Sequence, residues 1–449
     1  MGERLVVIGG DAGGMGAATA ARRLRPDLDI VALEKSDFTS YSACGIPYLV
    51  GGEVHRLDDL VARTPQQLRE NHRIDVRLRH EAMAIDLDRR DVEVRDHDHE
   101  RTFRLPFDQL LIATGARPKR PDIPGIDGPG IFGVQTLDDG ARLLERIEAS
   151  PVRRVVVVGG GYIGLEMAEA FLHRGAAVTV VERAPEVMTT LDPDMGSLVS
   201  RAMRRHGVDV RCGTTTTAFG EGTVHTDKGD LPADLVVLGL GVEPNSGLAA
   251  DAGITTGARG AISVSRRQQT SCDGVWAAGD CSDSYHLVSD THVHIALGTI
   301  ANKQARVAGI NIAGGYATFP GVVGTATSKI CDTEVARTGL NEAEARRAGF
   351  DVRAATIEAT TRAGYYPGAA PIAVKMVAER RSGRLLGAQL VGEEGAAKRI
   401  DVVAVALHAR MTVEQMTHLD LSYAPPFSPV WDPVLVAARE VAGLVTSDA

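Results

Sequence analysis

The sequence predicts an α/β protein that contains two Rossmann-like strand–helix–strand units, one near residue 10 and one near residue 160. The prediction rests on a pattern that occurs at both places. An apolar strand leads directly into a glycine-rich turn, and a helix and a second apolar strand ending in glutamate follow. A chain of 449 residues has room for about three domains of roughly 150 residues each, so the two units account for only part of it.

The first unit carries a glycine turn between two predicted strands. Its strand, turn, helix and second strand are expected over residues 4–8, 9–14, 15–24 and 29–34. Gly9 and Gly14 allow a tight turn and a close approach of the backbone to a pyrophosphate, and Glu34 can accept hydrogen bonds from ribose hydroxyls. Asp11 replaces the middle glycine of the GxGxxG pattern, so this motif alone is only moderately specific.

The second unit matches the same pattern without a substitution. Its strand and turn are expected over residues 154–158 and 159–164, followed by a helix through Phe171 and a second strand over 177–182. Gly159, Gly161 and Gly164 are all in register, and Glu182 ends the second strand. Two such units in one chain predict two bound dinucleotides. Glu182 should bind a free ribose 2′-hydroxyl and repel a 2′-phosphate, which favours NADH, although the neighbouring Arg183 would soften that discrimination.

Three further apolar strands end in glycine-containing turns. They are expected at the segments 110–118, 233–245 and 274–281. On their own these patterns indicate only buried strands followed by a bend in the backbone. In the last segment Asp280 follows a glycine, a position from which a carboxylate can bind a ribityl hydroxyl of a flavin.

Cys44 lies in the segment Ser40–Tyr48, shortly after the first unit, and has no second cysteine within reach in sequence. A Cys-x4-Cys pair would require cysteine at position 39 or 49, where the chain has threonine and leucine. Most free cysteines are inert small apolar residues. If Cys44 is redox active, it must therefore act alone.

Composition narrows the classes of partner. The formal net charge is −9 and there is no Lys/Arg-rich block, so nucleic acid is not an expected partner. No 18 apolar residues run together, and the chain passes straight into the first glycine turn, so we expect a cytoplasmic protein without a membrane segment. Five scattered cysteines fit a reducing compartment.

Taken together, these motifs resemble the pyridine-nucleotide disulfide oxidoreductase superfamily over nearly the whole chain. The resemblance implies two Rossmann-like domains, for FAD and for NAD, followed by a C-terminal α+β dimerisation domain and hence a homodimer. The implied domains are an FAD domain at 1–117 and 249–323, an NAD(P) domain at 118–248 and a dimerisation domain at 324–449. The implied cofactors are FAD and NADH, with NADPH left open.

The same resemblance assigns cofactor contacts to residues of this chain. The implied FAD contacts are Gly9, Gly14, Glu34, Ala113, Gly115 and Asp280. The implied NAD contacts are Gly159, Gly161, Gly164 and Glu182. The sequence from Ser40 through Cys44 to Tyr48 resembles the single-cysteine branch, which contains coenzyme A-disulfide reductases, persulfide reductases and NADH oxidases or peroxidases.

Other residues favour the coenzyme A-disulfide reductases within this branch. NADH peroxidases and related oxidases carry a histidine in the first glycine loop, where this chain has Asp11-Ala12-Gly13. The segments at 364–368 and 422–428 resemble the two tyrosine segments that coenzyme A-disulfide reductases bring across the dimer interface. The resemblance therefore implies catalytic roles for Cys44, Tyr365 and Tyr423. Phe427 stands where the second segment often has tyrosine, which leaves open which phenol, Tyr366 included, donates the proton.

The resulting hypothesis is an FAD-dependent NAD(P)H oxidoreductase that reduces a low-molecular-weight disulfide, coenzyme A disulfide above all. Cys44 would form a mixed disulfide with the substrate, and its thiolate would be favoured by a nearby helix N-terminus and by the oxidised flavin. Two enzymatic alternatives stay open, an NADH oxidase or peroxidase and a persulfide or polysulfide reductase. A non-catalytic flavoprotein that senses redox state is the alternative of another class.

Several histidines imitate a metal site, and no metal is expected. His97 and His99 alternate with carboxylates, but they lie between strand-like runs and are interpreted as a charged hairpin turn. His292 and His294 are likewise not expected to bind a metal, and their role is left open. Arg22, Arg23 and Arg25 of the first helix are interpreted as a solvated face rather than a substrate site.

Overall fold

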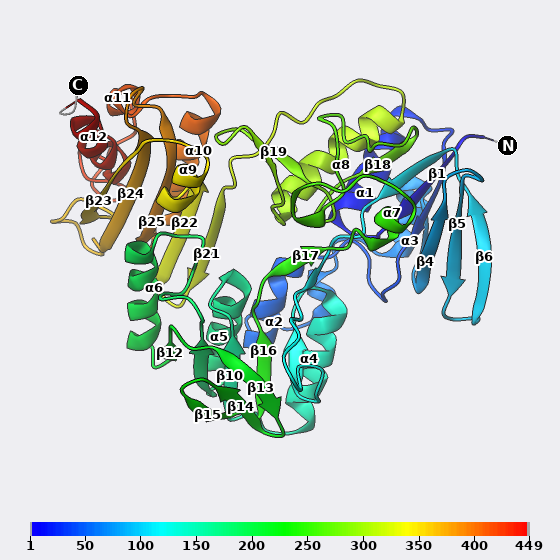
Figure 1. Cartoon of the computed structure of the whole chain (residues 1–449), viewed down its shortest axis with the longest axis horizontal. Helices are drawn as coiled ribbons and strands as arrows, with labels where there is room; N and C mark the ends of the chain where they lie inside the picture. Colours follow the sequence, from blue (N-terminus) through cyan, green and yellow to red (C-terminus); the bar gives the residue numbers. More distant parts are fainter. Residues whose placement is uncertain (1, 447–449) are drawn as a thin grey trace.

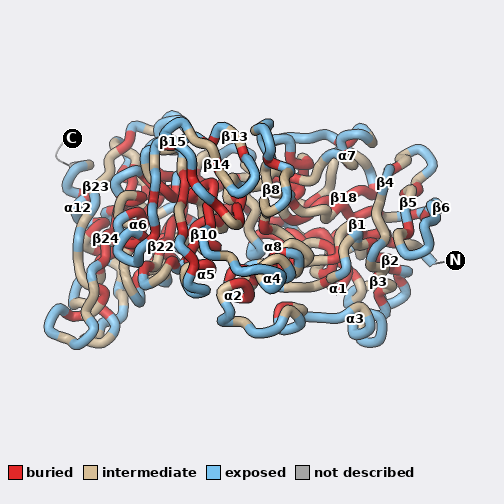
Figure 2. Tube along the Cα trace, turned by 90° about the horizontal axis from the view of Figure 1, so that it is seen from below, coloured by how far each residue is buried: buried red, intermediate tan, exposed pale blue. Residues whose placement is uncertain are grey.

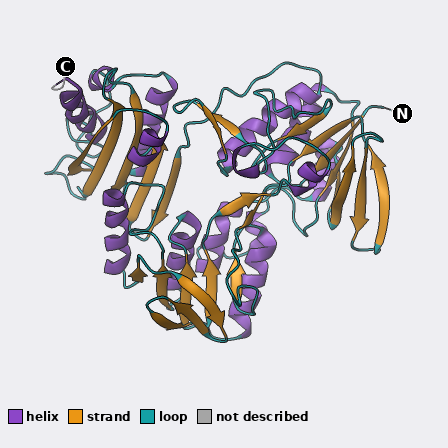
Figure 3. Ribbon diagram, viewed as in Figure 1, coloured by secondary structure: helices purple, strands orange, loops and turns teal. Residues whose placement is uncertain are grey.

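The computed structural model describes residues 2–446 and shows three parts, each built around a five-stranded sheet (Figure 1). Figure 2 shows that the buried residues follow these sheets and the helices packed on them, whereas connecting segments are mostly exposed. The sheets and helices stand out separately in Figure 3. The predicted α/β class, with two dinucleotide-binding units and a C-terminal α+β domain, is confirmed.

The first sheet is parallel and has the strand order β18-β7-β1-β2-β3. Its strands are β1 (Arg4–Ile8), β2 (Asp29–Leu33), β3 (Asp75–Arg77), β7 (Gln109–Ile112) and β18 (Val275–Ala277). Side chains along β1 alternate between two cores. Leu5 and Val7 pack with two helices on one face, and Val6 and Ile8 pack with an antiparallel sheet on the other.

Small residues let the two covering helices, α1 (Ala12–Leu24) and α8 (Gly298–Ile312), pack closely. A Cβ atom on Gly309 would lie 2.3 Å from the carbonyl oxygen of Ala17, so glycine is required there. The antiparallel sheet on the other face consists of β4 (His80–Asp86), β5 (Asp91–Asp96) and β6 (Arg101–Pro106).

The second sheet is also parallel and has the order β12-β11-β10-β16-β9. Its strands are β9 (Ile131–Gly133), β10 (Arg154–Val158), β11 (Ala177–Val181), β12 (Asp209–Arg211) and β16 (Leu235–Leu238). Three helices belong to this part, α4 (Leu137–Ala149), α5 (Tyr162–His173) and α6 (Pro193–Arg205). A small antiparallel sheet completes it with β13 (Thr216–Gly220), β14 (Thr223–Thr226) and β15 (Gly229–Pro232).

The third sheet is antiparallel, with the order β21-β22-β25-β24-β23. Its strands are β21 (Ala326–Ile330), β22 (Thr333–Gly339), β23 (Val352–Thr360), β24 (Pro371–Glu379) and β25 (Leu385–Gly392). The helices of this part are α9 (Glu342–Arg347), α10 (Ile400–His408), α11 (Val413–Thr417) and α12 (Pro433–Thr446). We call residues 324–446 the C-terminal domain.

Shorter elements complete the three parts and the connections between them. They are α2 (Ile46–Gly51), α3 (Pro65–His72), α7 (Gly247–Asp251), β8 (Ala116–Pro118), β17 (Val242–Pro244), β19 (Ser284–His286) and β20 (Thr291–Val293). β8 and β17 pair antiparallel, so the chain enters and leaves the second part through two adjacent segments. Each five-stranded sheet lies within one predicted domain, while the domain limits themselves remain a prediction.

The predicted elements of the two units agree closely with the structure. The strands at 4–8 and 154–158 have the predicted bounds, and the first helix begins at Ala12, three residues earlier than predicted. Within the described residues, no helix combines the length and apolar character needed to cross a membrane.

Candidate active site

Cys44 lies at the junction of the first and second parts. It occupies a single turn of 3-10 helix, Ala43–Gly45, immediately before α2, and the residue is exposed. Ile46, two residues later, is only 1 % exposed and belongs to the core of the second part. Helix α2 packs against α5, the helix of the second glycine motif (Figure 1). The Cys44 loop is therefore held against both dinucleotide-binding units.

The first glycine turn has no space for side chains at its two predicted glycines. A Cβ atom on Gly9, whose φ is +112°, would lie 2.1 Å from the carbonyl oxygen of Ala113. One on Gly14 would lie 1.9 Å from the carbonyl oxygen of Gly9. Glu34 accepts hydrogen bonds from the backbone N–H groups of Gly10 (2.7 Å) and Ser36 (2.9 Å). The turn is thus closely packed and has its carboxylate beside it, as dinucleotide binding requires.

Asp11, which departs from the GxGxxG pattern, joins the glycine turn to the Cys44 loop. Its Oδ1 accepts a hydrogen bond from the backbone N–H of Tyr41 (3.1 Å). The backbone N–H of Ser40 donates to the carbonyl oxygen of Gly10 (3.0 Å), in the same loop segment as Tyr41 and shortly before Cys44. Burial raises the pKa of Asp11 to about 6, and the nearby carboxylates of Glu34 and Asp280 act in the same direction. The sequence showed Asp11 only as an irregularity, whereas the structure gives it a positioning role.

The second glycine turn repeats the geometry of the first. A Cβ atom on Gly159 would lie 2.4 Å from the carbonyl oxygen of Gly239, and one on Gly164 would lie 2.1 Å from that of Gly159. Glu182 accepts hydrogen bonds from the backbone N–H groups of Gly160 (2.8 Å) and Ala184 (2.7 Å). Gly161 is the N-cap residue of α5, so the positive end of this helix faces the turn.

The remaining residues of the predicted flavin site lie at the carboxyl ends of the first sheet. Ala113 and Gly115 follow β7, and Asp280 follows β18. Thr114 and Asn245 tie the turn after β7 to the turn after β17. The Thr114 hydroxyl donates to the Asn245 carbonyl (2.6 Å), and the Asn245 amide donates to the Thr114 carbonyl (2.9 Å). In parallel sheets this crevice is the usual place for a nucleotide.

Asp280 presents a buried carboxylate at this crevice. Burial raises its pKa to about 6, and no described residue donates a hydrogen bond to its side chain to offset that burial. Such a group is suited to accept hydrogen bonds from a polyhydroxyl ligand, so the residues fit a flavin ribityl chain. His294 hydrogen-bonds through Nε2 to the main-chain oxygen of Asp280 (2.7 Å), and His292 pairs with Asp283 (3.2 Å).

The electrostatic surroundings of Cys44 differ from the prediction. Partial burial of the thiol raises its pKa, and the carboxylates of Glu166 and Asp280 raise it further. The predicted helix N-terminus is present, but α2 has only six residues and does not reverse these effects. In the protein alone, burial and these two carboxylates therefore raise the pKa of Cys44, and the predicted preference for the thiolate depends on the bound flavin, the other cause named for it.

Glu166 is a site residue that the sequence analysis missed. It lies on α5, and its charge raises the pKa values of both Cys44 and Tyr48. Burial raises the pKa of Glu166 itself, although the Ser328 hydroxyl donates a hydrogen bond to its Oε1 (2.7 Å). A glutamate in a largely apolar helix was the available signal, but its proximity to Cys44 depends on how α2 packs against α5.

The two predicted tyrosines come together in the C-terminal domain. The phenol of Tyr365 lies close to that of Tyr423, whose proximity raises the pKa of Tyr365, and both side chains are exposed. Arg399 holds their segments by donating from Nη2 to the carbonyl oxygens of Thr361 (2.7 Å) and Phe427 (2.8 Å). Among the contacts of the described residues, neither tyrosine touches Cys44 of the same chain.

Exposed apolar side chains follow Tyr423 in the chain. Phe427, Val430 and Trp431 are 74 %, 68 % and 54 % exposed. An exposed apolar patch of this kind indicates a protein interface. The location fits the prediction that the tyrosines act on a partner subunit.

The histidines discounted as metal ligands lie in a hairpin, as predicted. β5 and β6 pair antiparallel, and His97 and His99 occupy the turn, where they pair with Glu81 (3.1 Å) and Asp96 (2.9 Å). Arg22 donates to four backbone carbonyls, two of them in the 72–73 segment, so its guanidinium has a structural role.

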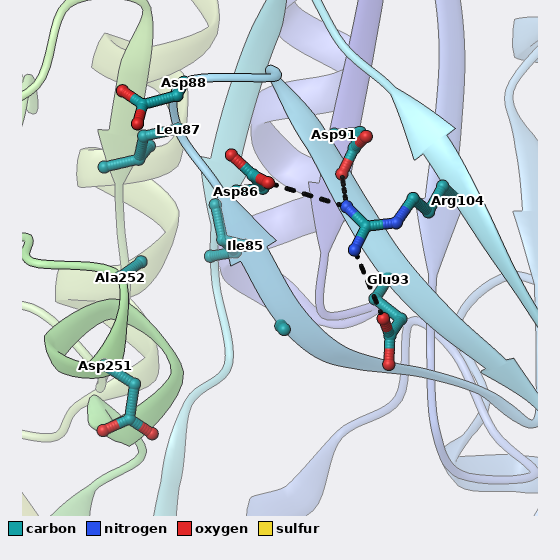
Figure 4. Close-up of a pocket in the computed structure, with 10 residues that line it drawn as sticks. Ile85, Asp86, Leu87, Asp88, Asp91, Glu93, Arg104, Asp251 and Ala252 are labelled. Atoms are coloured by element: carbon teal, nitrogen blue, oxygen red, sulfur yellow. Dashed lines mark hydrogen bonds and ion pairs between the residues drawn. The ribbon is translucent and has the colours of Figure 1, made fainter.

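A cavity of about 450 Å³ lies apart from the predicted site, between the β4–β6 sheet and α7 (Figure 4). Arg104 bonds there with Asp91 (2.7 Å) and lies near Asp86 and Glu93, while Asp251 comes from α7. None of the predicted cofactor or catalytic residues lines it.

Comparison with known proteins matches nearly the whole chain. Residues 3–305 match the family described as pyridine nucleotide-disulphide oxidoreductase, and residues 325–433 match the dimerisation domain of that family. A coenzyme A polysulfide/persulfide reductase that uses NAD(P)H, from Pyrococcus horikoshii, is 40% identical over 98% of this chain and 98% of its own. A coenzyme A disulfide reductase from Staphylococcus aureus is 29% identical over 95% of this chain and 96% of its own.

A solved structure has the same fold. The NAD-dependent persulfide reductase from A. fulgidus aligns with a TM-score of 0.95 at 38% identity, covering 99% of this chain and 84% of that one. The same family is indicated by the geometry of the chain, namely its two glycine turns, the crevice with Asp280 and the C-terminal sheet. The chain therefore belongs to the pyridine nucleotide-disulphide oxidoreductase family and is an FAD-type NAD(P)H oxidoreductase.

Proposed function

We propose that this oxidoreductase reduces a sulfur–sulfur bond in a low-molecular-weight acceptor, and that Cys44 is its only redox-active cysteine. The observation that carries the proposal is the placement of Cys44. It is exposed, lies between the two dinucleotide-binding units, and forms no disulfide with any of the other four cysteines. A lone cysteine can exchange with an external sulfur compound but cannot close an internal disulfide.

Cys44 performs the sulfur chemistry in this proposal. Its thiolate attacks the acceptor R–S–S–R′, so that a Cys44–S–S–R bond forms and R′S⁻ leaves and takes up a proton. When bound, NADH and FAD supply the hydride and the two electrons that cleave the mixed disulfide. Cys44 thereby returns to the thiolate and RSH is released, so that each cycle consumes one NADH and one proton and yields two thiols. For a persulfide, R′S⁻ is replaced by HS⁻.

Coenzyme A is the group that we propose the acceptor carries. Coenzyme A disulfide was the expectation from the sequence, and a relative at 29% identity is named for that substrate. The relative at 40% identity is named for coenzyme A polysulfide and persulfide. This difference favours a coenzyme A persulfide or polysulfide as the acceptor, with coenzyme A disulfide as the second candidate.

A hollow of about 360 Å³ beside α8 suits the phosphates of such an acceptor. Lys303 and Arg306 of α8 line it together with His408, and no carboxylate is among its described lining residues. Because the chain as a whole is acidic, a cationic hollow is a distinctive feature. We expect Arg306→Ala to raise the KM for coenzyme A-linked acceptors and to leave the KM for an uncharged disulfide unchanged.

The proposed proton donor is the pair Tyr365 and Tyr423 in a homodimer. Tyr365 and Tyr423 are exposed beside an apolar patch, and the C-terminal domain matches a dimerisation domain. We propose that the pair of one subunit reaches Cys44 of the other and protonates the leaving thiolate. Removal of one phenol should then lower kcat. A heterodimer of a Cys44→Ser protomer and a Tyr365→Phe protomer should keep one active site, because the intact tyrosine of the first serves the intact cysteine of the second.

Glu182 is the proposed basis for a preference for NADH. It lies beside the second glycine turn, where its carboxylate can accept hydrogen bonds from a ribose 2′-hydroxyl and would repel a 2′-phosphate. Arg183 is exposed and adjacent, so NADPH is expected to be accepted less well rather than excluded.

The decisive experiment is an acceptor screen with the wild type beside Cys44→Ser. Coenzyme A persulfide, coenzyme A disulfide, hydrogen peroxide and oxygen are supplied separately while NADH oxidation is followed. We expect turnover with a sulfur acceptor that falls more than about 100-fold in the variant. Oxygen consumption that is fast and independent of Cys44 would identify an oxidase instead. Slow turnover with every acceptor would favour a redox sensor.

A further inference from the structure

Residues 187–192 lie across the second glycine turn and link it to the C-terminal domain. The backbone N–H of Met188 donates to the carbonyl oxygen of Gly160 (2.7 Å). A Cβ atom on Gly160 would lie 2.8 Å from Cγ1 of Val187, so this segment closes directly onto the turn. The hydroxyl of Thr190 lies 3.5 Å from the phenol oxygen of Tyr162, the first residue of α5. The segment therefore contacts both the turn and the start of its helix.

The backbone of this segment is held in an unusual conformation. Met188 has a φ of +53°, in the left-handed region that few residues other than glycine adopt. Such a residue keeps this conformation only where its surroundings determine it. Val187 and Met188 are each 1 % exposed, and their core cluster includes Ile330 and Val391 of the C-terminal sheet. The segment and the C-terminal sheet therefore share one continuous core.

A first polar anchor comes from β22. Nη1 of Arg337 donates to the carbonyl oxygen of Thr190 (2.5 Å), and Nδ2 of Asn341 donates to the same oxygen (3.3 Å). Glu344 orients the guanidinium through a 2.6 Å ion pair with Nη2. Because the side chain of Arg337 is only 11% exposed, water competes little for these bonds.

A second anchor fixes the other end of the segment at Asp192. The side-chain oxygen of Gln389 accepts from the Asp192 backbone N–H (2.7 Å), and its nitrogen donates to Asp192 Oδ2 (2.6 Å). Lys375 adds ion pairs to Asp192 (3.3 Å), Asp194 (2.9 Å) and Glu342 (2.6 Å). Gln389 and Lys375 come from the adjacent strands β25 and β24, close to the start of α6 (Figure 1).

We propose that Arg337 and Gln389 are positioning residues for the nicotinamide dinucleotide, although neither belongs to the unit that binds it. They act by fixing residues 187–192 and, through them, the glycine turn and the start of α5. Loss of either anchor lets the turn relax, which weakens nucleotide binding without removing a group that reacts. This inference concerns the dinucleotide site alone and holds whichever sulfur compound is the acceptor.

Arg337→Lys and Gln389→Met test the proposal in the FAD-loaded protein. Lysine keeps the charge beside Glu344 but has no guanidinium fork, and methionine keeps the volume of glutamine without its hydrogen bonds. Steady-state kinetics with NADH and ferricyanide avoid any dependence on the sulfur acceptor. We expect the KM for NADH to rise about 5- to 20-fold, with kcat within about two-fold of the wild type.

Thr356→Val is the matched control. The Thr356 hydroxyl donates to Asp194 Oδ2 (3.1 Å), so it joins the same two parts without contacting residues 187–192. We expect the KM for NADH to be unchanged in this variant. A lower melting temperature with an unchanged KM for NADH in both anchor variants would overturn the proposal and leave the network a merely structural role. An equal rise in KM in Thr356→Val would overturn it as well, since the effect would then not pass through the segment.

Discussion

Replacement of Asp11 by asparagine tests the link between the first glycine turn and the Cys44 loop. Asparagine has the same shape, and its Oδ1 can still accept the hydrogen bond from the Tyr41 N–H, which is 3.1 Å long in the wild type. The substitution therefore removes a charge while keeping the contact. Burial is the main cause that raises the pKa of Asp11 to about 6 from an ordinary value of 3.8, and Glu34 and Asp280 add to it.

The direction of the pH effect follows from this raised pKa. The folded protein binds the Asp11 proton more tightly than the unfolded chain does, so binding of this proton stabilises the fold. The full stabilisation is present below pH 3.8. That contribution is lost as the pH rises through about 6. A pKa difference of about 2 corresponds to about 3 kcal/mol, and we expect about 1 to 3 kcal/mol because Asp11 is only partly buried. The asparagine of the variant behaves like the protonated carboxyl at every pH.

Thermal unfolding between pH 5 and pH 8 measures the effect. The variant should already be the more stable of the two at pH 5, where the unfolded chain has lost this proton and the folded wild type still holds it, and its advantage should roughly double by pH 8, to on the order of 5 °C. Asp88→Asn, which changes an exposed carboxylate in the loop between β4 and β5, should show no such trend. A difference between Asp11→Asn and wild type that stays constant or shrinks with rising pH would refute the reasoning.

Three further predictions concern the turns and the thiol. Gly14→Ala should abolish flavin binding or folding, because its Cβ would lie 1.9 Å from a backbone oxygen. Gly247→Ala is the control and should be neutral, because a Cβ there would have no atom within 4 Å. Flavin absorbance per purified chain checks both variants. Glu182→Ala should lower the ratio of kcat/KM for NADH to that for NADPH by about 10- to 100-fold, and an unchanged ratio would exclude its role. Glu166→Gln should lower the pKa of Cys44, because the charge of Glu166 raises that pKa in the wild type. Alkylation of Cys44 by iodoacetamide at pH 7.5 should therefore be faster in the variant, and a slower reaction would contradict this direction of the pKa change.

Local sequence was sufficient to predict both dinucleotide-binding units. The alternation of apolar strand, glycine turn and helix depends on residues that are neighbours in the chain, and glycine is required where a Cβ would meet a carbonyl. For the same reason Glu34 and Glu182 could be assigned as strand-terminal carboxylates, and both lie beside their turns. The isolation of Cys44 was equally readable, because it is a property of spacing alone.

The charge around Cys44 could not be read in this way. Glu166 is 122 positions away in sequence and influences the thiol only because α2 packs on α5, so the adjacent helix N-terminus could not show that the surrounding protein raises the pKa of Cys44. Asp11 was likewise visible as a missing glycine, but its bond to the Tyr41 backbone depends on how a loop folds back over the turn.

The sequence by itself thus determined the two nucleotide units, the lone cysteine and the tyrosine segments, since each depends on short-range pattern. Only the tertiary structure decided which groups surround them. It placed Glu166 near Cys44, brought Tyr365 and Tyr423 together, and fixed residues 187–192 from the C-terminal sheet. The physical reason is that electrostatic and packing effects depend on distance in space, which the order of residues along a chain does not specify.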